Sequence, residues 1–82
     1  MTNTIIWTKT DCPYCHVAKD MLASKNIEFE ERIIGEGWTR DQLLESAPDA
    51  KTVPQIWLRG EYIGGCDDLE QYYEEHDMWR DD

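Results

Sequence analysis

The sequence predicts one small α/β domain, spanning residues 1–82, in which a mixed sheet carries helices on both faces. Three observations support this prediction. The chain has 82 residues, and one domain is expected per ~100–200 residues. Hydrophobic residues make up 40% of it, which is enough for a small core. The local patterns follow the order strand, helix, strand, helix, strand, strand, helix, so that a βαβ unit precedes a β-hairpin.

The first three elements form the βαβ unit, whose strands should be parallel and whose crossover should be right-handed. Residues 3–9 are β-branched and aromatic, which favours a strand. Pro13 fits the first position of a helix, because that position needs no N–H donor. This helix continues to about Ser24, and its apolar stripe consists of Val17, Ala18, Met21 and Leu22. Residues 27–33 begin with period-two alternation and form the second strand.

Two further helices are expected. Thr39 and Gln42 have the spacing of a capping box, in which each residue satisfies a backbone N–H at the start of a helix. That helix should end near Pro48. The last helix shows an apolar stripe at helical spacing, formed by Leu69, Tyr72 and Tyr73.

A β-hairpin should lie between these two helices. Residues 53–59 read Val-Pro-Gln-Ile-Trp-Leu-Arg, which predicts a third strand. Gly60–Glu61 is the expected turn, and residues 62–64 form the fourth strand. The hairpin should join the sheet antiparallel to the βαβ unit.

Charge and composition exclude several classes of function. The net charge is −10, and residues 61–82 carry nine acids against one base. With no basic stripe for phosphates, nucleic-acid binding is not expected; the acidic end should be a solvated helix face and tail. No apolar run approaches the ~18–20 residues of a membrane helix. Residues 1–6 show no secretory signal, so we expect a cytoplasmic protein.

The three cysteines indicate the chemistry. Cys12 and Cys15 form a Cys-x-x-Cys pair, which in a cytosolic protein is typical of a redox or metal site. Cys12 lies at a helix start, where unpaired N–H groups and the helix dipole stabilise a thiolate, and Lys9 adds positive charge nearby. A stabilised thiolate gains little in attack but is expelled readily from a mixed disulfide. We therefore expect Cys12 to be the nucleophile and Cys15 the resolving thiol.

Two alternatives remain open for this pair. Cys12 to His16 also matches Cys-x-x-Cys-His, the pattern of haem attachment, which is usual outside the cytoplasm. A zinc site would need Cys12, Cys15, Cys66 and a histidine to converge, but the sequence lacks a second close pair of ligands. The βαβ context favours thiol–disulfide chemistry.

Three segments together resemble the glutaredoxins. They are Lys9 with Cys12-Pro13-Tyr14-Cys15, then Thr52-Val53-Pro54, then Gly64-Gly65-Cys66-Asp67-Asp68-Leu69. The resemblance runs from Ile5 to about Tyr73. It implies a single glutaredoxin domain with the thioredoxin fold, a four-stranded mixed sheet with three helices in the order β-α-β-α-β-β-α.

The resemblance also implies a glutathione site. A cis bond between Val53 and Pro54 would present the Val53 backbone to the extended peptide, and the first helical N–H groups after Gly65 would bind the γ-glutamyl carboxylate. Lys9 and Arg40 are expected at the glycyl carboxylate, with Gln42 as the rival of Arg40. The implied glutathione contacts are Lys9, Tyr14, Arg40, Thr52, Val53, Pro54, Gly65, Cys66 and Asp67. Cys66 is expected to act through its backbone, although its thiol could be redox-active.

The implied function is a glutathione-dependent thiol–disulfide oxidoreductase that reduces protein disulfides and glutathione mixed disulfides through Cys12 and Cys15. Glutathione is then the reducing co-substrate, and no tightly bound cofactor or metal is expected. The partners would be disulfide-containing or glutathionylated proteins, with ribonucleotide reductase as a family-level candidate, and the protein would be a monomer. The alternatives are a glutathione-ligated iron–sulfur cluster carrier and a thioredoxin-like electron donor fed by a reductase.

Overall fold

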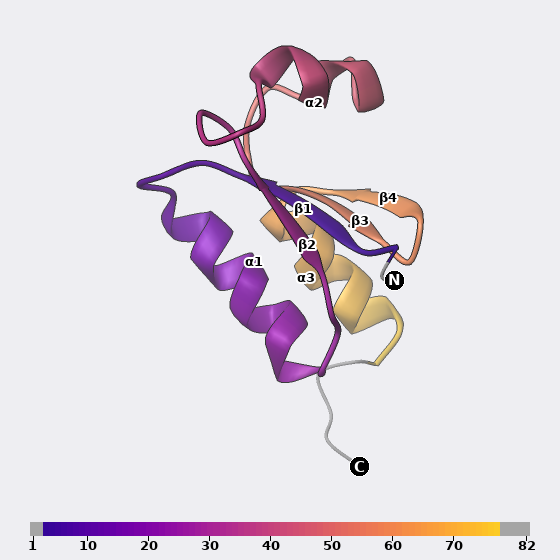
Figure 1. Cartoon of the computed structure of the whole chain (residues 1–82). Coiled ribbons are helices and arrows are strands. Elements are labelled where there is room, and N and C mark those ends of the chain that lie inside the picture. Colours follow the sequence, from indigo (N-terminus) through magenta and orange to yellow (C-terminus); the bar gives the residue numbers. More distant parts are fainter. Residues whose placement is uncertain (1–2, 78–82) are drawn as a thin grey trace.

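A four-stranded mixed sheet with three helices forms the part of the chain described by the computed structural model, residues 3–77 (Figure 1). In chain order the elements are β1 (Ile5–Thr8), α1 (Pro13–Ser24), β2 (Glu30–Ile33), α2 (Arg40–Ser46), β3 (Gln55–Leu58), β4 (Glu61–Gly64) and α3 (Cys66–Glu75). The strands lie in the order β2-β1-β3-β4. β1 is parallel to β2 and antiparallel to β3, and β3 is antiparallel to β4. The predicted element order is confirmed; the acidic end at 78–82 lies outside the described residues.

The hairpin turn differs by one residue from the prediction of Gly60–Glu61. Arg59 and Gly60 form the turn, with φ angles of +52° and +88°, and Glu61 already pairs with Leu58. Two-residue turns with positive φ match the right-handed twist of the strands that they join. The prediction missed this because arginine rarely adopts a left-handed conformation.

Two strands are shorter than the predicted ranges 27–33 and 53–59. The ladder between β1 and β2 begins where Ile5 pairs with Glu30, so the residues before Glu30 have no partner in β1. Strand β3 begins only after Pro54, because proline has no N–H to donate to a ladder. Strand β1, Ile5–Thr8, is also shorter than its predicted range of residues 3–9.

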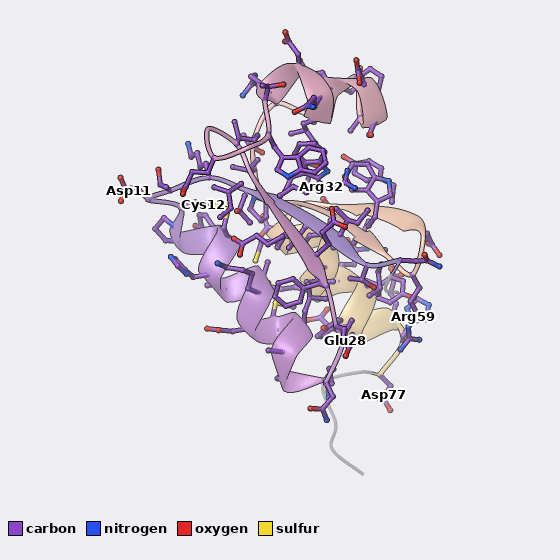
Figure 2. All side chains as sticks on the ribbon, in the orientation of Figure 1. Asp11, Cys12, Glu28, Arg32, Arg59 and Asp77 are labelled. Atoms are coloured by element: carbon purple, nitrogen blue, oxygen red, sulfur yellow. A yellow bond between two sulfur atoms is a disulfide. The ribbon has the colours of Figure 1, made fainter. Side chains whose placement is uncertain are left out.

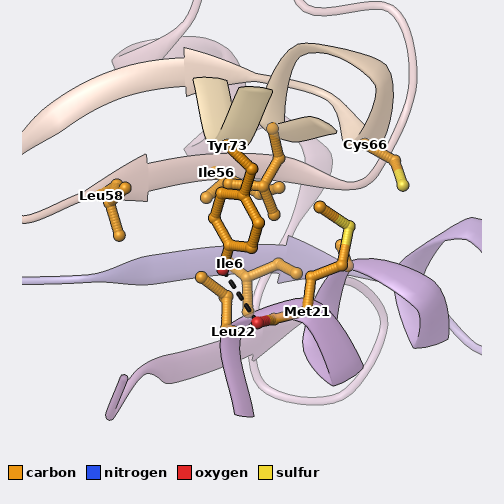
Figure 3. Close-up of a cluster of buried hydrophobic side chains, with 9 residues drawn as sticks. Ile6, Met21, Leu22, Ile56, Leu58, Cys66 and Tyr73 are labelled. Carbon is orange, nitrogen blue, oxygen red and sulfur yellow. Dashed lines mark hydrogen bonds between the residues drawn. The ribbon is translucent and has the colours of Figure 1, made fainter. Parts of the chain in front are cut away.

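The sheet separates two hydrophobic clusters, because successive side chains of a strand point to opposite faces. Ile6 of β1 is fully buried on the face that α1 and α3 cover, whereas Trp7 is buried beneath α2. Figure 3 shows the first cluster, which consists of Ile6, Ala18, Met21, Leu22, Ile56, Leu58, Cys66, Leu69 and Tyr73. Within it the Tyr73 hydroxyl donates to the Met21 carbonyl oxygen over 2.8 Å, which ties α3 to α1.

The second cluster is smaller and is built around tryptophan. Its buried members are Trp7, Leu43, Ala47 and Ala50. Trp38 meets Trp7 edge-to-face with ring centroids 5.2 Å apart, and the Arg32 guanidinium lies 4.2 Å from the Trp38 ring centroid. These contacts hold the loop before α2 against the sheet. The longest described helix, α1, has 12 residues, and among residues 3–77 no helix has the length and apolar character of a membrane span.

Candidate functional site

Cys12 caps the N-terminus of α1. Its backbone is extended (φ −121°, ψ 95°), and Pro13 follows at the start of the helix, as the sequence predicted. The Cys15 N–H donates to the Cys12 sulfur over 3.2 Å. Figure 2 places Cys12 and Asp11 at this end of α1, far from Glu28 and Arg59 at the other end of the molecule. A sulfur in this position faces the positive end of the helix dipole, where a thiolate is stabilised.

The two cysteines of the motif form a disulfide, so the structure holds the oxidised state of the pair. Their Cα atoms are 5.2 Å apart across one helical turn. Cys12 is 5% exposed and Cys15 2%. Both residues are therefore buried in the oxidised state, and the roles of Cys12 as nucleophile and Cys15 as resolving thiol stay predictions.

The segment Thr52-Val53-Pro54 lies directly beside the reactive pair. The Val53–Pro54 peptide bond is cis, as the resemblance implies. The Val53 carbonyl oxygen lies 3.8 Å from the Cys12 sulfur. An extended peptide linked to that sulfur would therefore have backbone groups of Val53 within reach for strand-like pairing.

A groove of about 460 Å³ opens next to this segment. Seven of the nine expected glutathione contacts line it, namely Tyr14, Thr52, Val53, Pro54, Gly65, Cys66 and Asp67. The groove thus joins three segments that lie far apart in the sequence: the start of α1, the segment before β3 and the start of α3. Lys9 and Arg40 are absent from its lining.

The N-terminus of α3 forms one wall of the groove. Gly65 caps this helix without a side chain, and its N–H donates to an Asp68 carboxylate oxygen over 2.9 Å. Gly64 has a φ of +116°, and a Cβ at this position would lie 2.4 Å from Asp68 Oδ2. The N–H groups in the first turn, at Cys66 and Asp67, have no carbonyl partner within the helix. They form a site suited to a carboxylate.

Lys9 lines a neighbouring groove, and its expected contact with the glycyl carboxylate stays a prediction. Its neighbours there include Asp11, His16 and Glu31. Glu31 accepts hydrogen bonds from the Thr8 hydroxyl (2.8 Å) and the Lys19 ammonium (3.0 Å). Partial burial raises the pKa of Glu31, but these hydrogen bonds and the charges of Lys19 and His16 outweigh it and hold that pKa below its ordinary value.

Arg40 reaches the rim of the first groove indirectly. Its guanidinium donates to the Lys51 carbonyl oxygen over 3.2 Å, and Lys51 lines the groove. Gln42 is engaged elsewhere: its side-chain oxygen accepts from the Thr39 N–H over 2.7 Å, and its own N–H donates to the Thr39 hydroxyl over 3.2 Å. The predicted capping box is therefore confirmed, and of the two rivals the structure brings Arg40 nearer to the groove.

Cys66 does not join the reactive pair. Its side chain is 6% exposed and belongs to the cluster around Met21 and Leu69. Burial, followed by the negative charges of Glu70 and Asp67, raises the pKa of its thiol. A neutral, buried thiol is a poor nucleophile, and the role of the Cys66 backbone toward a ligand stays a prediction. Across residues 3–77, His, Cys, Asp and Glu side chains form no group of three that could hold a metal ion.

Gln55 and Tyr62 also line the groove, although neither is among the contacts expected from the sequence. Gln55 is buried, at 6% exposure, and Tyr62 contacts it from the neighbouring strand. One signal was available for Gln55, which is a polar residue at the start of an otherwise apolar strand and directly follows the Thr-Val-Pro segment.

Comparisons with known proteins agree with this geometry. A sequence profile of the glutaredoxin family matches residues 4–63. Glutaredoxin 3 of Escherichia coli strain K12 is 46% identical over 70 residues, which cover 84% of this chain and 83% of that protein.

Solved structures give the same likeness. The solution structure of glutaredoxin from Brucella melitensis has a TM-score of 0.75 and 36% identity, with 95% of this chain and 85% of that one covered. The crystal structure of glutaredoxin 1 from Francisella tularensis, complexed with cacodylate, has a TM-score of 0.74 and 30% identity, with 94% and 96% covered. The expected fold, a four-stranded mixed sheet with three helices, is therefore confirmed.

Proposed function

This chain belongs to the glutaredoxin family and is a thiol–disulfide oxidoreductase, and from that premise we propose that glutathione is its reducing co-substrate and binds in the groove beside Cys12. One observation carries the proposal. The Cys12 sulfur lies 3.8 Å from the carbonyl oxygen of Val53, and Val53 and the first turn of α3 line the same groove. They match, in order, the thiol, the peptide backbone and the γ-glutamyl carboxylate of glutathione.

The polar ends of glutathione would be bound by opposite ends of the groove. The N–H groups of Cys66 and Asp67 suit the γ-glutamyl carboxylate, and the Asp67 carboxylate suits the adjacent amine. The glycyl carboxylate would then lie toward Lys51 and Arg40, which meet at the other rim. Lys9 lies in the neighbouring groove, and its contact with this carboxylate stays a prediction beside that of Arg40.

The reaction consists of thiolate–disulfide exchanges. The Cys12 thiolate attacks the glutathione sulfur of a glutathionylated thiol, which forms a Cys12–glutathione disulfide and expels the other thiolate. A second glutathione thiolate then attacks the bound glutathione sulfur, so that oxidised glutathione leaves and Cys12 returns as a thiolate. The helix N-terminus assists this last step, because it stabilises the leaving Cys12 thiolate.

A protein disulfide would use both cysteines. Cys12 attacks one sulfur of the substrate and releases the other as a thiolate. Cys15 then attacks the Cys12 sulfur, which frees the second substrate thiolate and leaves the Cys12–Cys15 disulfide that the structure contains. Two glutathione molecules reduce this disulfide and leave as oxidised glutathione.

The test is a glutathione-dependent reduction assay, coupled to glutathione reductase, on a small glutathione mixed disulfide and on a protein disulfide. Cys12→Ser should lose both activities. Cys15→Ser should keep the first and lose the second, while Cys66→Ser, as the matched control, keeps both. Activity in Cys12→Ser would refute the role of this sulfur. A wild-type protein that accepts electrons from a thioredoxin reductase and not from glutathione would refute the proposed co-substrate.

A further inference from the structure

A chain of two hydrogen bonds connects strand β4 to the segment beside the reactive sulfur. The Tyr62 hydroxyl donates to the Gln55 side-chain oxygen over 2.6 Å. The side-chain nitrogen of Gln55 donates to the Thr52 carbonyl oxygen over 2.8 Å. Thr52 is the neighbour of Val53, whose carbonyl oxygen lies 3.8 Å from the Cys12 sulfur. The orientation of one buried amide thus links Tyr62 to the wall of the groove.

Tyr62 determines which end of the Gln55 amide faces Thr52. A primary amide has a donor end and an acceptor end, and the Thr52 carbonyl oxygen can accept only from the donor end. A hydroxyl that donates to the amide oxygen holds the amide in this orientation. Burial, together with the negative charges of Asp68 and Asp49, raises the pKa of Tyr62, so the hydroxyl keeps its proton at neutral pH.

Tyr62 is 49% exposed, and contacts within the hairpin hold its ring. It pairs with Trp57 across the hairpin, and the two ring centroids are 4.7 Å apart. A register shift follows at Ile56, which pairs with Gly64 instead of Ile63. Trp57 and Gln55 lie on the same face of β3, so a side chain opposite Trp57 reaches the diagonal neighbour Gln55.

We propose that Tyr62 is a positioning residue for substrate binding: through Gln55 it holds the segment Thr52–Pro54 at the distance from Cys12 at which Val53 can pair with glutathione. This inference rests on the proposed function, because it assigns a role within the same groove. Tyr62 does not contact the Cys12 sulfur. Its loss should therefore weaken substrate binding and leave the exchange steps at Cys12 unchanged.

The test compares Tyr62→Phe with Tyr72→Phe, a matched control on α3 outside the groove. The substrate is the mixed disulfide of cysteine and glutathione. For Tyr62→Phe we expect KM to rise about three- to tenfold, the range for one uncharged hydrogen bond, with kcat within about twofold of wild type. Tyr72→Phe should leave both constants unchanged. A KM for Tyr62→Phe equal to that of the control, or a fall in kcat at constant KM, would overturn the proposal.

A double-mutant cycle with Gln55→Met tests whether Tyr62 acts through Gln55. We expect Tyr62→Phe to raise KM no further in the Gln55→Met background; two effects that multiply would overturn the proposed connection. If Gln55→Met does not fold, exchange of the Gln55 side-chain amide protons replaces the cycle. Faster exchange in Tyr62→Phe than in wild type supports the proposal, and unchanged exchange refutes it.

The proposed function and the proposed role of Tyr62 can be refuted separately, because the first is tested with the wild type and the second with the Tyr62→Phe variant. Wild-type protein without saturable glutathione-dependent activity refutes the proposed function. If the wild type is active and Tyr62→Phe has the same KM and kcat, only the role of Tyr62 is refuted. The amide-exchange comparison of Gln55 needs no glutathione, so it reports on the hydrogen bonds even where the co-substrate proves to be another thiol.

Discussion

Replacing Gly64 by alanine would test how the start of α3 is built. Two costs add at this position. The φ of +116° is one that alanine adopts only with strain, at a cost of roughly 1–3 kcal/mol. The new Cβ would lie 2.4 Å from Asp68 Oδ2 and 2.9 Å from Asp68 Cγ, so the carboxylate must move. Its hydrogen bond from the Gly65 N–H is then lost, as when a helix cap is removed, at about 1 kcal/mol.

The expected loss for Gly64→Ala is therefore about 2–4 kcal/mol in the free energy of unfolding. Gly60→Ala is the matched control, because Gly60 also has a positive φ, +88°, but a Cβ there meets no atom within 4 Å. It should show the backbone cost alone. The difference between the two variants then measures the displacement of Asp68.

The assay is urea unfolding of the oxidised protein, followed by tryptophan fluorescence, with wild type, both alanine variants, Asp68→Ala and the double variant Gly64→Ala/Asp68→Ala. Asp68→Ala should cost about 1 kcal/mol. The double variant should be no less stable than Gly64→Ala, because the same hydrogen bond is lost in each. Equal losses for Gly64→Ala and Gly60→Ala, or additive losses in the double variant, would refute this account.

Three further predictions concern charge and reactivity. Because the folded state lowers the pKa of Glu31, its carboxylate stabilises the protein above about pH 4.5 and loses this effect as the pH falls through the folded-state pKa. In urea titrations, the difference in stability between wild type and Glu31→Gln, about 1 kcal/mol or less, should therefore narrow below pH 4.5. A difference that does not depend on pH would contradict this prediction. In the reduced protein, iodoacetamide should modify Cys12 near pH 6, whereas Cys66, with its raised pKa, should react only at alkaline pH. Peptide mass spectrometry measures both reactions, and equal rates for Cys12 and Cys66 would contradict the assignment of Cys12 as the nucleophile. In the coupled assay, Arg40→Gln should raise the KM for glutathione several-fold, whereas Lys9→Gln should leave it nearly unchanged. A larger effect of Lys9→Gln than of Arg40→Gln would assign the glycyl contact to Lys9.

The local features of the reactive pair could be predicted because they depend on neighbours in the sequence. Pro13 indicates a helix start whatever the tertiary structure, and this places Cys12 at the cap. Thr39 and Gln42 likewise predict a capping box from their spacing alone, and both hydrogen bonds are present. The segments around Val53 and Gly65 were expected at the site from the family resemblance.

The direction of side chains across the sheet could not be predicted in the same way. Tyr62 meets Gln55 because it pairs with Trp57 and Gln55 is its diagonal neighbour on the same face of β3; the expected turn at Gly60–Glu61 does not give this register. Lys9 was expected near Cys12 as a positive charge from its spacing, and at the glycyl carboxylate from the family resemblance. Between them Asp11 has a φ of +57°, a left-handed conformation that the sequence pattern did not indicate, and Lys9 lines the neighbouring groove.

The burial of Cys12, which is 5% exposed as a residue in the oxidised state, would limit which disulfides can react with its sulfur. Thiol–disulfide exchange requires access to the sulfur that is attacked, and a bond lying flat on a folded surface could not approach this one. A small molecule fits, as does a disulfide carried on a protruding or unfolded stretch of chain. Selection among protein substrates would then depend on how far their disulfides project from the surface.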